Sequence, residues 1–353
     1  PGSNMPSGPA TFPCLLQTLM PPLSMSGLGS MAVPIVRKSW HKEGYLANQL
    51  DYSRAISECR RSSSWRQVVH LLSAMIANSI QINTITCGAA ISTCGTKGGW
   101  VQALELLGTM ASRFVQLDTI VCSAAISACK KDGEWEQALQ LLGTMASGLM
   151  QLDTIACSAA ISACEKDGAW GLALELLRTM AHSSIQMNTI TCSAAISACE
   201  KAGEWMQALE LLSIMVGEGI QIDTSTYNAA ISACEKGGEW THALELLSTM
   251  ATSSIQKNTI TCSVAISACE KHGLWTQVLQ LLSMMARYAV QRDVVTYSSA
   301  VNACAKGGEW TQAFELLSAM ARSSVQIDTV VCGAAINACE KCSEWLQALV
   351  FLS

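Results

Sequence analysis

The chain contains few charged or aromatic residues and no long apolar run. Of its 353 residues, 14% are charged and 5% are Phe, Trp or Tyr, whereas 50% are hydrophobic. This composition excludes a disordered chain and suits helices that are packed on both faces. No apolar run reaches the roughly 18 residues that a membrane-spanning helix needs. The sequence therefore predicts a soluble intracellular protein without a membrane partner.

Motifs for catalysis and for cofactor binding are also missing. Neither a glycine-rich phosphate loop nor a nucleophile elbow is present, and the histidines share no common position in the repeat described below. The segments 41–43 (His-Lys-Glu) and 339–342 (Cys-Glu-Lys-Cys) resemble parts of a zinc deaminase motif, but they lie about 300 residues apart. The sequence predicts no enzyme, no cofactor and no metal site.

Proline is confined to the N-terminal end of the chain. All seven prolines lie within residues 1–48, where Glu43 is the only acidic residue. We interpret residues 1–48 as a disordered leader or a targeting segment. Its shortage of acids, its serines and the pair Arg37 and Lys38 loosely resemble an organelle transit peptide. A plain disordered terminus is the alternative.

Cysteine is abundant, with 17 residues, but its spacing argues against a disulfide framework. Seven residues on a helix rise about 10 Å, which exceeds the roughly 7 Å between the Cα atoms of a disulfide. We therefore expect buried apolar thiols in a reducing compartment. Pairs spaced by seven are Cys87 and Cys94, Cys122 and Cys129, Cys157 and Cys164, Cys192 and Cys199, Cys262 and Cys269, and Cys332 and Cys339.

Tryptophan recurs every 35 residues along most of the chain. A fixed period of this length indicates a stacked array of small units rather than two or three globular domains. The period predicts eight full repeats, 49–83, 84–118, 119–153, 154–188, 189–223, 224–258, 259–293 and 294–328, and a partial ninth at 329–353. The recurring residues are Trp65, Trp100, Trp135, Trp170, Trp205, Trp240, Trp275, Trp310 and Trp345.

Each repeat carries two helical stripes, which a glycine separates in seven of the repeats. In the repeat 119–153, the first stripe is formed by Cys122, Ala125, Ile126 and Cys129, and the second by Trp135, Ala138, Leu139, Leu142 and Met145. Gly133 lies between them, where a helix is expected to end. Each repeat is thus predicted to be a helical hairpin, which needs neighbouring repeats to cover its apolar stripes. The fold class is all-α, with the first helices forming a concave wall.

The 35-residue unit resembles the repeat of the pentatricopeptide repeat proteins, in its P-type form. At 293–317 the chain reads Asp-Val-Val-Thr-Tyr-Ser-Ser-Ala-Val-Asn-Ala-Cys-Ala-Lys-Gly-Gly-Glu-Trp-Thr-Gln-Ala-Phe-Glu-Leu-Leu, and related sequences continue in phase over residues 49–353. The resemblance implies a right-handed α-solenoid of stacked helix-turn-helix repeats. It also implies binding of single-stranded RNA, with one base per repeat.

The resemblance implies that the fifth and last residues of each repeat read one base together. The fifth residues are Ser53, Gly88, Ser123, Ser158, Ser193, Asn228, Ser263, Ser298 and Gly333. The last residues are Asn83, Asp118, Asp153, Asn188, Asp223, Asn258, Asp293 and Asp328. These short side chains form hydrogen bonds, and exchanging Asp for Asn replaces an acceptor by a donor. Helix capping is the alternative explanation for the column of last residues.

Two further columns are implied to contact the RNA. The second residues of the repeats are expected to sandwich the bases, and they are Leu50, Ile85, Ile120, Ile155, Ile190, Ile260, Val295 and Val330, with Ser225 as an exception. A column of cations is expected to meet phosphate, namely Arg61, Lys131, Lys166, Lys201, Lys236, Lys271, Lys306 and Lys341. The alternative is that these cations stabilise helix C-termini. The net charge of -5 argues against strong electrostatic attraction to RNA.

The predicted function is sequence-specific binding of single-stranded RNA. By the family's usual correspondences the target reads A, unassigned, G, A, G, pyrimidine, G, G from 5′ to 3′. The family implies a role in RNA processing, stability or translation in the mitochondrion or chloroplast, with other RNA-processing proteins as partners and a monomeric state. A protein-binding helical-repeat scaffold is the alternative, although the tetratricopeptide scaffold has a 34-residue period.

Overall fold

The computed structural model describes residues 48–62, 64–78, 80, 82–95, 99–112, 117–148, 150–253, 255–323, 325 and 329–341. Of the leader predicted at residues 1–48, all but Asn48 lies outside these described residues. The same holds for the end of the partial ninth repeat, from residue 342 onward.

All regular secondary structure of the described residues is helical, which confirms the all-α class. The helices alternate between the first and the second helix of a repeat. Their bounds are α1 (Gln49–Ser62), α2 (Trp65–Ala77), α3 (Thr84–Cys94), α4 (Trp100–Ser112), α5 (Thr119–Asp132), α6 (Trp135–Ser147), α7 (Thr154–Asp167), α8 (Trp170–His182), α9 (Thr189–Ala202), α10 (Trp205–Gly217), α11 (Thr224–Gly237), α12 (Trp240–Thr252), α13 (Thr259–Lys271), α14 (Trp275–Arg287), α15 (Val294–Gly307), α16 (Trp310–Arg322) and α17 (Thr329–Lys341).

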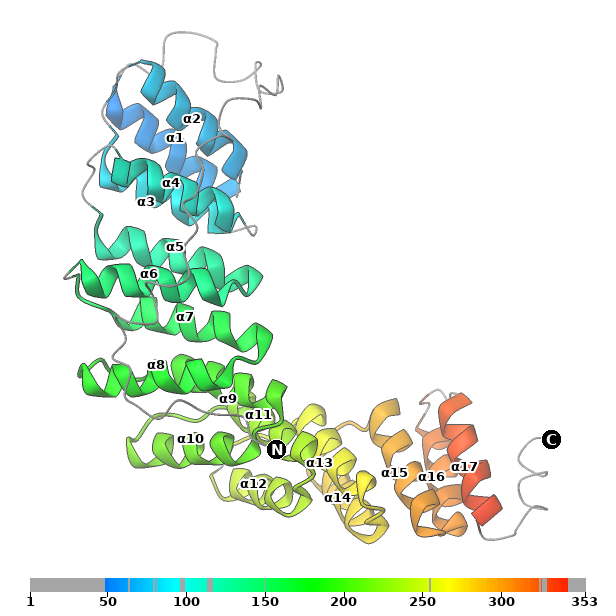
Figure 1. The fold of residues 1–353 in the computed structure, drawn as a ribbon. Helices are drawn as coiled ribbons and strands as arrows, with labels where there is room; N and C mark the ends of the chain where they lie inside the picture. The colour runs from blue at the N-terminus through cyan, green and yellow to red at the C-terminus, as the bar shows by residue number, and fades with distance from the viewer. Residues whose placement is uncertain are drawn as a thin grey trace, which may run out of the picture. The chain divides into compact units, whose positions relative to one another are not determined.

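The described helices belong to two compact units, one within residues 48–167 and 172–186 and the other within residues 168–171 and 187–341. In the first unit, α1, α3, α5 and α7 contact one another in chain order, and α2, α4 and α6 each pack on the first helix of their own repeat. In the second unit, α9, α11, α13, α15 and α17 form the corresponding series. Figure 1 shows these stacked hairpins, from blue to green in the first unit and from green to red in the second. The predicted solenoid of helical hairpins is confirmed.

Glycine ends the first helix of most repeats. Gly133 follows α5 with φ 85°, in the left-handed region, and its backbone N–H donates to the carbonyl of Cys129. A Cβ at this position would lie 2.9 Å from Cβ of Lys166 in the next repeat. Both the backbone and the packing therefore favour glycine here. Positive φ also occurs at Gly168, Gly203, Gly238, Gly273 and Gly308, as the spacing predicts.

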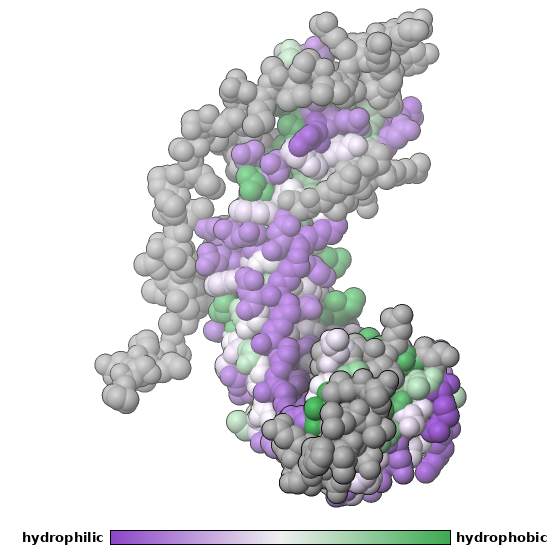
Figure 2. Space-filling view, turned by 90° about the vertical axis from the view of Figure 1, so that its right-hand side faces the viewer, coloured by the Kyte–Doolittle hydropathy of each residue, from purple (hydrophilic) through white to green (hydrophobic). Residues whose placement is uncertain are grey.

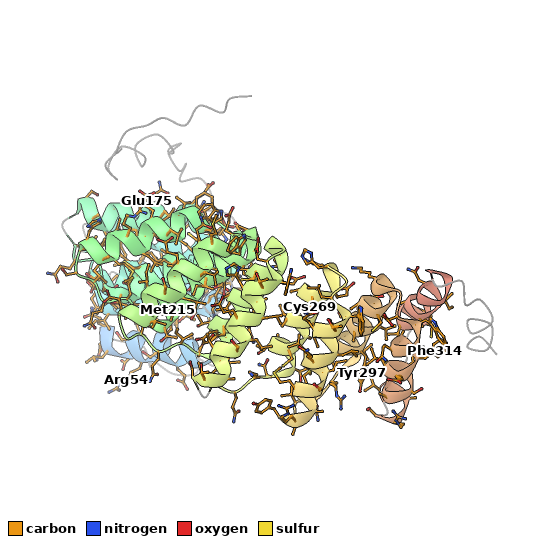
Figure 3. The ribbon with its side chains drawn as sticks, turned by 90° about the horizontal axis from the view of Figure 1, so that it is seen from below. Arg54, Glu175, Met215, Cys269, Tyr297 and Phe314 are labelled. Atoms are coloured by element: carbon orange, nitrogen blue, oxygen red, sulfur yellow. The ribbon has the colours of Figure 1, made fainter. Side chains whose placement is uncertain are left out.

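The core consists of aliphatic side chains, methionines and cysteines between the two helix layers. In Figure 3, the labelled Met215 of α10, Cys269 of α13 and Tyr297 of α15 lie among the packed helices of the second unit. All three are at most 1% exposed. Full burial of a methionine such as Met215 contributes about 1.5–3 kcal/mol. Stacking of hairpins therefore supplies the stability that a single hairpin lacks.

The cysteines behave as the spacing predicts. Every described cysteine side chain is a free thiol, and all of these are buried except Cys332, which is half-buried. Burial raises the pKa of Cys164 to about 12 and that of Cys157 to about 11. These thiols are therefore small apolar packing groups. In the part of the chain that the structure describes, no helix combines the length and the apolar character needed to cross a membrane.

Candidate nucleic-acid interface

The last residue of a repeat caps the first helix of the next repeat. In seven repeats its side-chain Oδ1 accepts a hydrogen bond, 2.8–2.9 Å long, from the backbone N–H three residues ahead. The capping alternative is therefore correct as a structural role. The donor and acceptor pairs are Thr86 and Asn83, Val121 and Asp118, Ala156 and Asp153, Thr191 and Asn188, Thr226 and Asp223, Thr261 and Asn258, and Thr296 and Asp293.

Capping also fixes which polar atom each of these side chains can offer to a ligand. A backbone N–H can only donate, so the capping atom of Asn258 must be its amide oxygen, and the amide nitrogen is left for a ligand. In Asp223 one carboxylate oxygen caps the helix, and the second carboxylate oxygen is left for a ligand. Asp therefore offers an acceptor where Asn offers a donor. Asp223, Asn258 and Asp293 are exposed, and Asn83, Asp118, Asp153 and Asn188 are half-buried. Asp328 lies outside the described residues.

The fifth residues lie in the first helices and are less exposed than the last residues. Ser123 is 5% exposed and Ser263 is 9% exposed. Ser123, Ser158 and Ser298 donate to the backbone carbonyl four residues earlier, at 2.6–2.7 Å. Asn228, Ser53, Ser158, Ser193 and Ser298 are half-buried. Gly88 and Gly333 offer no side chain.

The two predicted reading positions meet within one repeat. Ser123 Oγ lies 3.3 Å from Asp153 Oδ1, although 30 residues separate them along the chain. The reason is that Asp153 directly precedes α7, which packs on α5. A ligand group placed against this pair would find a hydroxyl and a carboxylate side by side.

A third position, which the sequence analysis missed, joins the reading pair in two of the described repeats. Thr226 Oγ1 lies 2.7 Å from Asp223 Oδ1 and 2.5 Å from Ser193 Oγ. The recurrence of threonine as third residue was the available signal, but a threonine near a helix start is common for other reasons. Threonine occupies this position at Thr86, Thr191, Thr226, Thr261 and Thr296, and all five are at most 1% exposed.

The aliphatic second residues are exposed on the first turn of each first helix. Their exposed fractions range from 58% at Val295 to 75% at Ile85. The exposed set comprises Leu50, Ile85, Ile120, Ile155, Ile190, Ile260 and Val295. Ser225 is exposed as well, and the side chain of Val330 lies outside the described residues. Apolar side chains that are exposed at the same position of successive repeats mark a candidate binding surface.

The predicted phosphate-binding lysines are partly neutralised by glutamates of the preceding repeat. Each glutamate directly precedes the lysine of its own repeat but pairs with the lysine 36 residues later. The lysine side chains are 40–46% exposed and the glutamates 17–26%. The Nζ–Oε1 distances are 3.1 Å for Lys236 and Glu200, 2.7 Å for Lys271 and Glu235, and 2.8 Å for Lys306 and Glu270.

For the remaining cations of this column, the structure gives the exposure of three lysines. Lys131, Lys166 and Lys201 are exposed and each makes an interaction of its own. The side chains of Arg61 and Lys341 lie outside the described residues. In Figure 2, hydrophilic residues form a band that runs down the visible face of the stacked helices. Within the described residues, no three His, Cys, Asp or Glu side chains gather closely enough to hold a metal ion.

Comparison with known families assigns the repeats. The PPR repeat family matches residues 187–236, and the PPR repeat itself matches residues 120–147, 225–255, 260–289 and 295–325. The chain therefore belongs to the pentatricopeptide repeat (PPR) family. This membership confirms the resemblance that the 35-residue period predicts.

Solved structures of PPR proteins share the fold. The pentatricopeptide repeat protein PPR10 from maize is 19% identical, with a TM-score of 0.55 over 86% of this chain and 48% of the PPR10 chain. PPR10 in complex with an 18-nt psaJ RNA element is 17% identical, with a TM-score of 0.54 over 86% of this chain and 49% of the other. This chain thus spans about half the length of PPR10. Among curated proteins, no match is found.

Proposed function

We propose that this chain binds single-stranded RNA in a sequence-specific manner, with one nucleotide for each repeat. The observation that carries the proposal is the contact between the fifth and last residues of one repeat, represented by Ser123 and Asp153 at 3.3 Å. Membership of the PPR family and the fold shared with RNA-bound PPR10 support it. Residues 49–353 would then be the RNA-binding array.

The polar atoms left by helix capping match the edges of the bases. The free carboxylate oxygen of Asp223 accepts hydrogen bonds, as the N1–H and N2–H groups of guanine require. The free amide nitrogen of Asn188 donates, which suits N1 of adenine. Asp in the last position would therefore favour guanine, and Asn would favour adenine or a pyrimidine. This agrees with the target AxGAGYGG, where x is any nucleotide and Y is a pyrimidine.

The exposed aliphatic residues supply the apolar part of the site. Ile155 and Ile190 are 65% and 60% exposed, and each is the second residue of a first helix, α7 and α9. Burial of such a side chain against the face of a base removes apolar surface from water at about 25 cal/mol per Å². Every base has such a face, so this contribution is independent of sequence.

Attraction to phosphate is weaker than eight cations would suggest. Lys236, Lys271 and Lys306 already have carboxylate partners, and the net charge of the chain is -5. Exposed ion pairs of this kind are typically worth about 0.2–1 kcal/mol, so a phosphate group can compete with the glutamate. We expect moderate affinity with a shallow dependence on salt.

The proposal also includes a cellular role for the chain. A role in RNA processing, stability or translation within the mitochondrion or chloroplast follows from the family, together with RNA-processing partner proteins. Monomeric binding fits an array in which each repeat contacts its neighbours along the chain.

A competition titration tests the binding proposal. The full chain is titrated against fluorescent AAGAGCGG RNA and against a shuffled RNA of the same composition, with polarisation as the readout. Several mismatches at about 1–3 kcal/mol each predict at least a tenfold preference for the first RNA. Equal affinity for both would end the base-reading proposal. Absence of RNA binding would favour the protein-binding scaffold instead.

A further inference from the structure

A buried threonine connects the two reading residues of the repeat 189–223. Thr226 Oγ1 lies 2.7 Å from Asp223 Oδ1 and 2.5 Å from Ser193 Oγ. Its side chain is fully buried, and its backbone N–H also donates to Asp223 Oδ1 at 2.8 Å. Thr226 is the third residue of the following repeat, so it belongs to neither reading position.

The neighbouring repeat shows the same arrangement with different reading residues. Thr261 Oγ1 lies 2.5 Å from Asn228 Oδ1 and 2.8 Å from Asn258 Oδ1. Thr261 is also fully buried. The threonine hydroxyl thus lies between the two reading residues whether the fifth residue is serine or asparagine. Because both partners of Thr261 are amide oxygens and its hydroxyl has one proton, Thr261 donates to one of them at a time.

The bridge restricts what the fifth residue can offer to a base. A hydroxyl carries one proton, and an ionised carboxylate can only accept. Thr226 therefore donates to Asp223 and accepts the proton of Ser193. The hydroxyl of Ser193 then has no further proton to donate, and it can only accept a hydrogen bond from a ligand. The threonine sets both the position and the hydrogen-bonding role of Ser193.

Repeats without the bridge arrange their fifth residue differently. Ser158 donates to the carbonyl of Thr154 although Thr191 follows its repeat, so a threonine at this position does not always form the bridge. Ala156 stands at the third position after the pair Ser123 and Asp153, and there Ser123 Oγ contacts Asp153 Oδ1 directly at 3.3 Å. Ser123 also donates to the carbonyl of Thr119 at 2.6 Å. Its proton is directed at the helix backbone instead of at a neighbouring hydroxyl.

We infer that Thr226 and Thr261 are positioning residues for base recognition, each acting on the reading pair of the preceding repeat. The inference rests on the proposed RNA binding and adds a third determinant to each of these two repeats. A repeat in which the threonine forms this bridge would discriminate more sharply between bases than a repeat without the bridge, because its reading side chains are held in one arrangement.

The test compares Thr226→Val and Thr226→Ser with the parent protein. Affinities are measured for RNAs that differ only at the fifth nucleotide, which the repeat 189–223 reads. We expect Thr226→Val to lower the preference for guanine over adenine at that nucleotide by about tenfold, the equivalent of one good polar contact. Thr226→Ser keeps the hydroxyl and should keep the preference.

A matched control introduces a threonine after a repeat whose fifth residue has no side chain to be bridged. Val121 occupies the third position after the repeat whose fifth residue is Gly88. Val121→Thr should leave the base preference at the second nucleotide unchanged, because no fifth side chain is there to be bridged. Thr261→Val gives an independent reading at the sixth nucleotide if Thr226→Val does not fold.

The possible outcomes distinguish the positioning role of the threonines from the proposed RNA binding. A parent protein without any preference at the fifth and sixth nucleotides overturns both. A parent with a preference that Thr226→Val and Thr261→Val retain in full overturns only the inference. Weaker binding of all RNAs by the same factor, with an unchanged preference, shows a structural role and also overturns it.

Discussion

Lys271 Nζ lies 2.7 Å from Glu235 Oε1, although the two residues belong to different repeats. The same lysine nitrogen donates to the backbone carbonyl of Glu235 at 2.9 Å. Lys306 and Glu270 repeat both contacts. These lysines therefore connect the C-terminal ends of successive first helices. If the chain binds RNA as proposed, a phosphate group would have to compete with the glutamates for them.

Removal of three glutamates should strengthen RNA binding. The triple variant Glu200→Gln, Glu235→Gln and Glu270→Gln frees Lys236, Lys271 and Lys306 for phosphate. On single strands each phosphate contact contributes about 0.7 to the logarithmic salt dependence, so the slope should steepen by up to about 2. Polarisation titrations across a salt series measure this change.

A control with the same change in net charge isolates the effect. Glu210, Glu245 and Glu315 are exposed on the second helices. Their joint replacement by glutamine should leave the slope nearly unchanged. If both triple variants steepen the slope equally, total charge explains the effect and the lysine column has no special part.

Helix capping and base reading can be separated at Asp223. Asp223→Ala removes the cap of α11 and should cost about 0.5–2 kcal/mol of unfolding free energy. Asp223→Ser keeps a capping oxygen and should lose far less, while its preference for guanine still falls because the free carboxylate oxygen is gone. Thermal melts and base-resolved titrations give the two readouts. A guanine preference that survives in Asp223→Ser would show that the carboxylate does not read the base.

Burial of the thiols predicts that they react slowly with alkylating reagents. Burial, helped by the charge of Glu134, raises the pKa of Cys129 to about 12. The folded protein should leave Cys129 unlabelled by iodoacetamide at pH 8, whereas half-buried Cys332 reacts. Peptide mass spectrometry measures the labelling at each site. Fast labelling of Cys129 without unfolding would contradict the predicted packing.

Two further buried thiols, Cys164 and Cys199, predict that the stability of the fold falls at high pH. Folding raises the pKa of Cys164 and Cys199 from 9.0 to about 12, so the folded state holds these protons more tightly. Their contribution is fully present below pH 9 and is lost as the pH rises toward about 12. Urea titrations at increasing pH should therefore show a falling unfolding free energy in this window. A flat profile would indicate that the thiols are solvated.

The sequence predicts the fold well because its signals are local to one repeat. The stripe from Cys122 to Cys129, the stop at Gly133 and the start at Trp135 all appear in the structure where their spacing places them. Each depends on helical periodicity or on the backbone conformation of a single residue. The period then multiplies these signals along the chain.

The site is less predictable because its contacts cross between repeats. Glu235 and Lys271 are 36 residues apart, and their pairing depends on the offset between stacked helices. The bridge from Thr226 to Ser193 depends on the same offset. Asp223 illustrates a second difficulty, since an aspartate at a helix start serves capping equally well with or without a ligand.

An RNA selection from a random pool, run in parallel on the parent chain and on Asp223→Asn, tests base reading most directly. Asparagine keeps the cap of α11 through its amide oxygen and replaces the free carboxylate oxygen by an amide nitrogen. The parent should enrich AxGAGYGG, and the variant should enrich adenine in place of guanine at the fifth nucleotide with the other nucleotides unchanged. An unchanged fifth nucleotide, or no enriched motif in the parent, would contradict recognition of one base by each repeat.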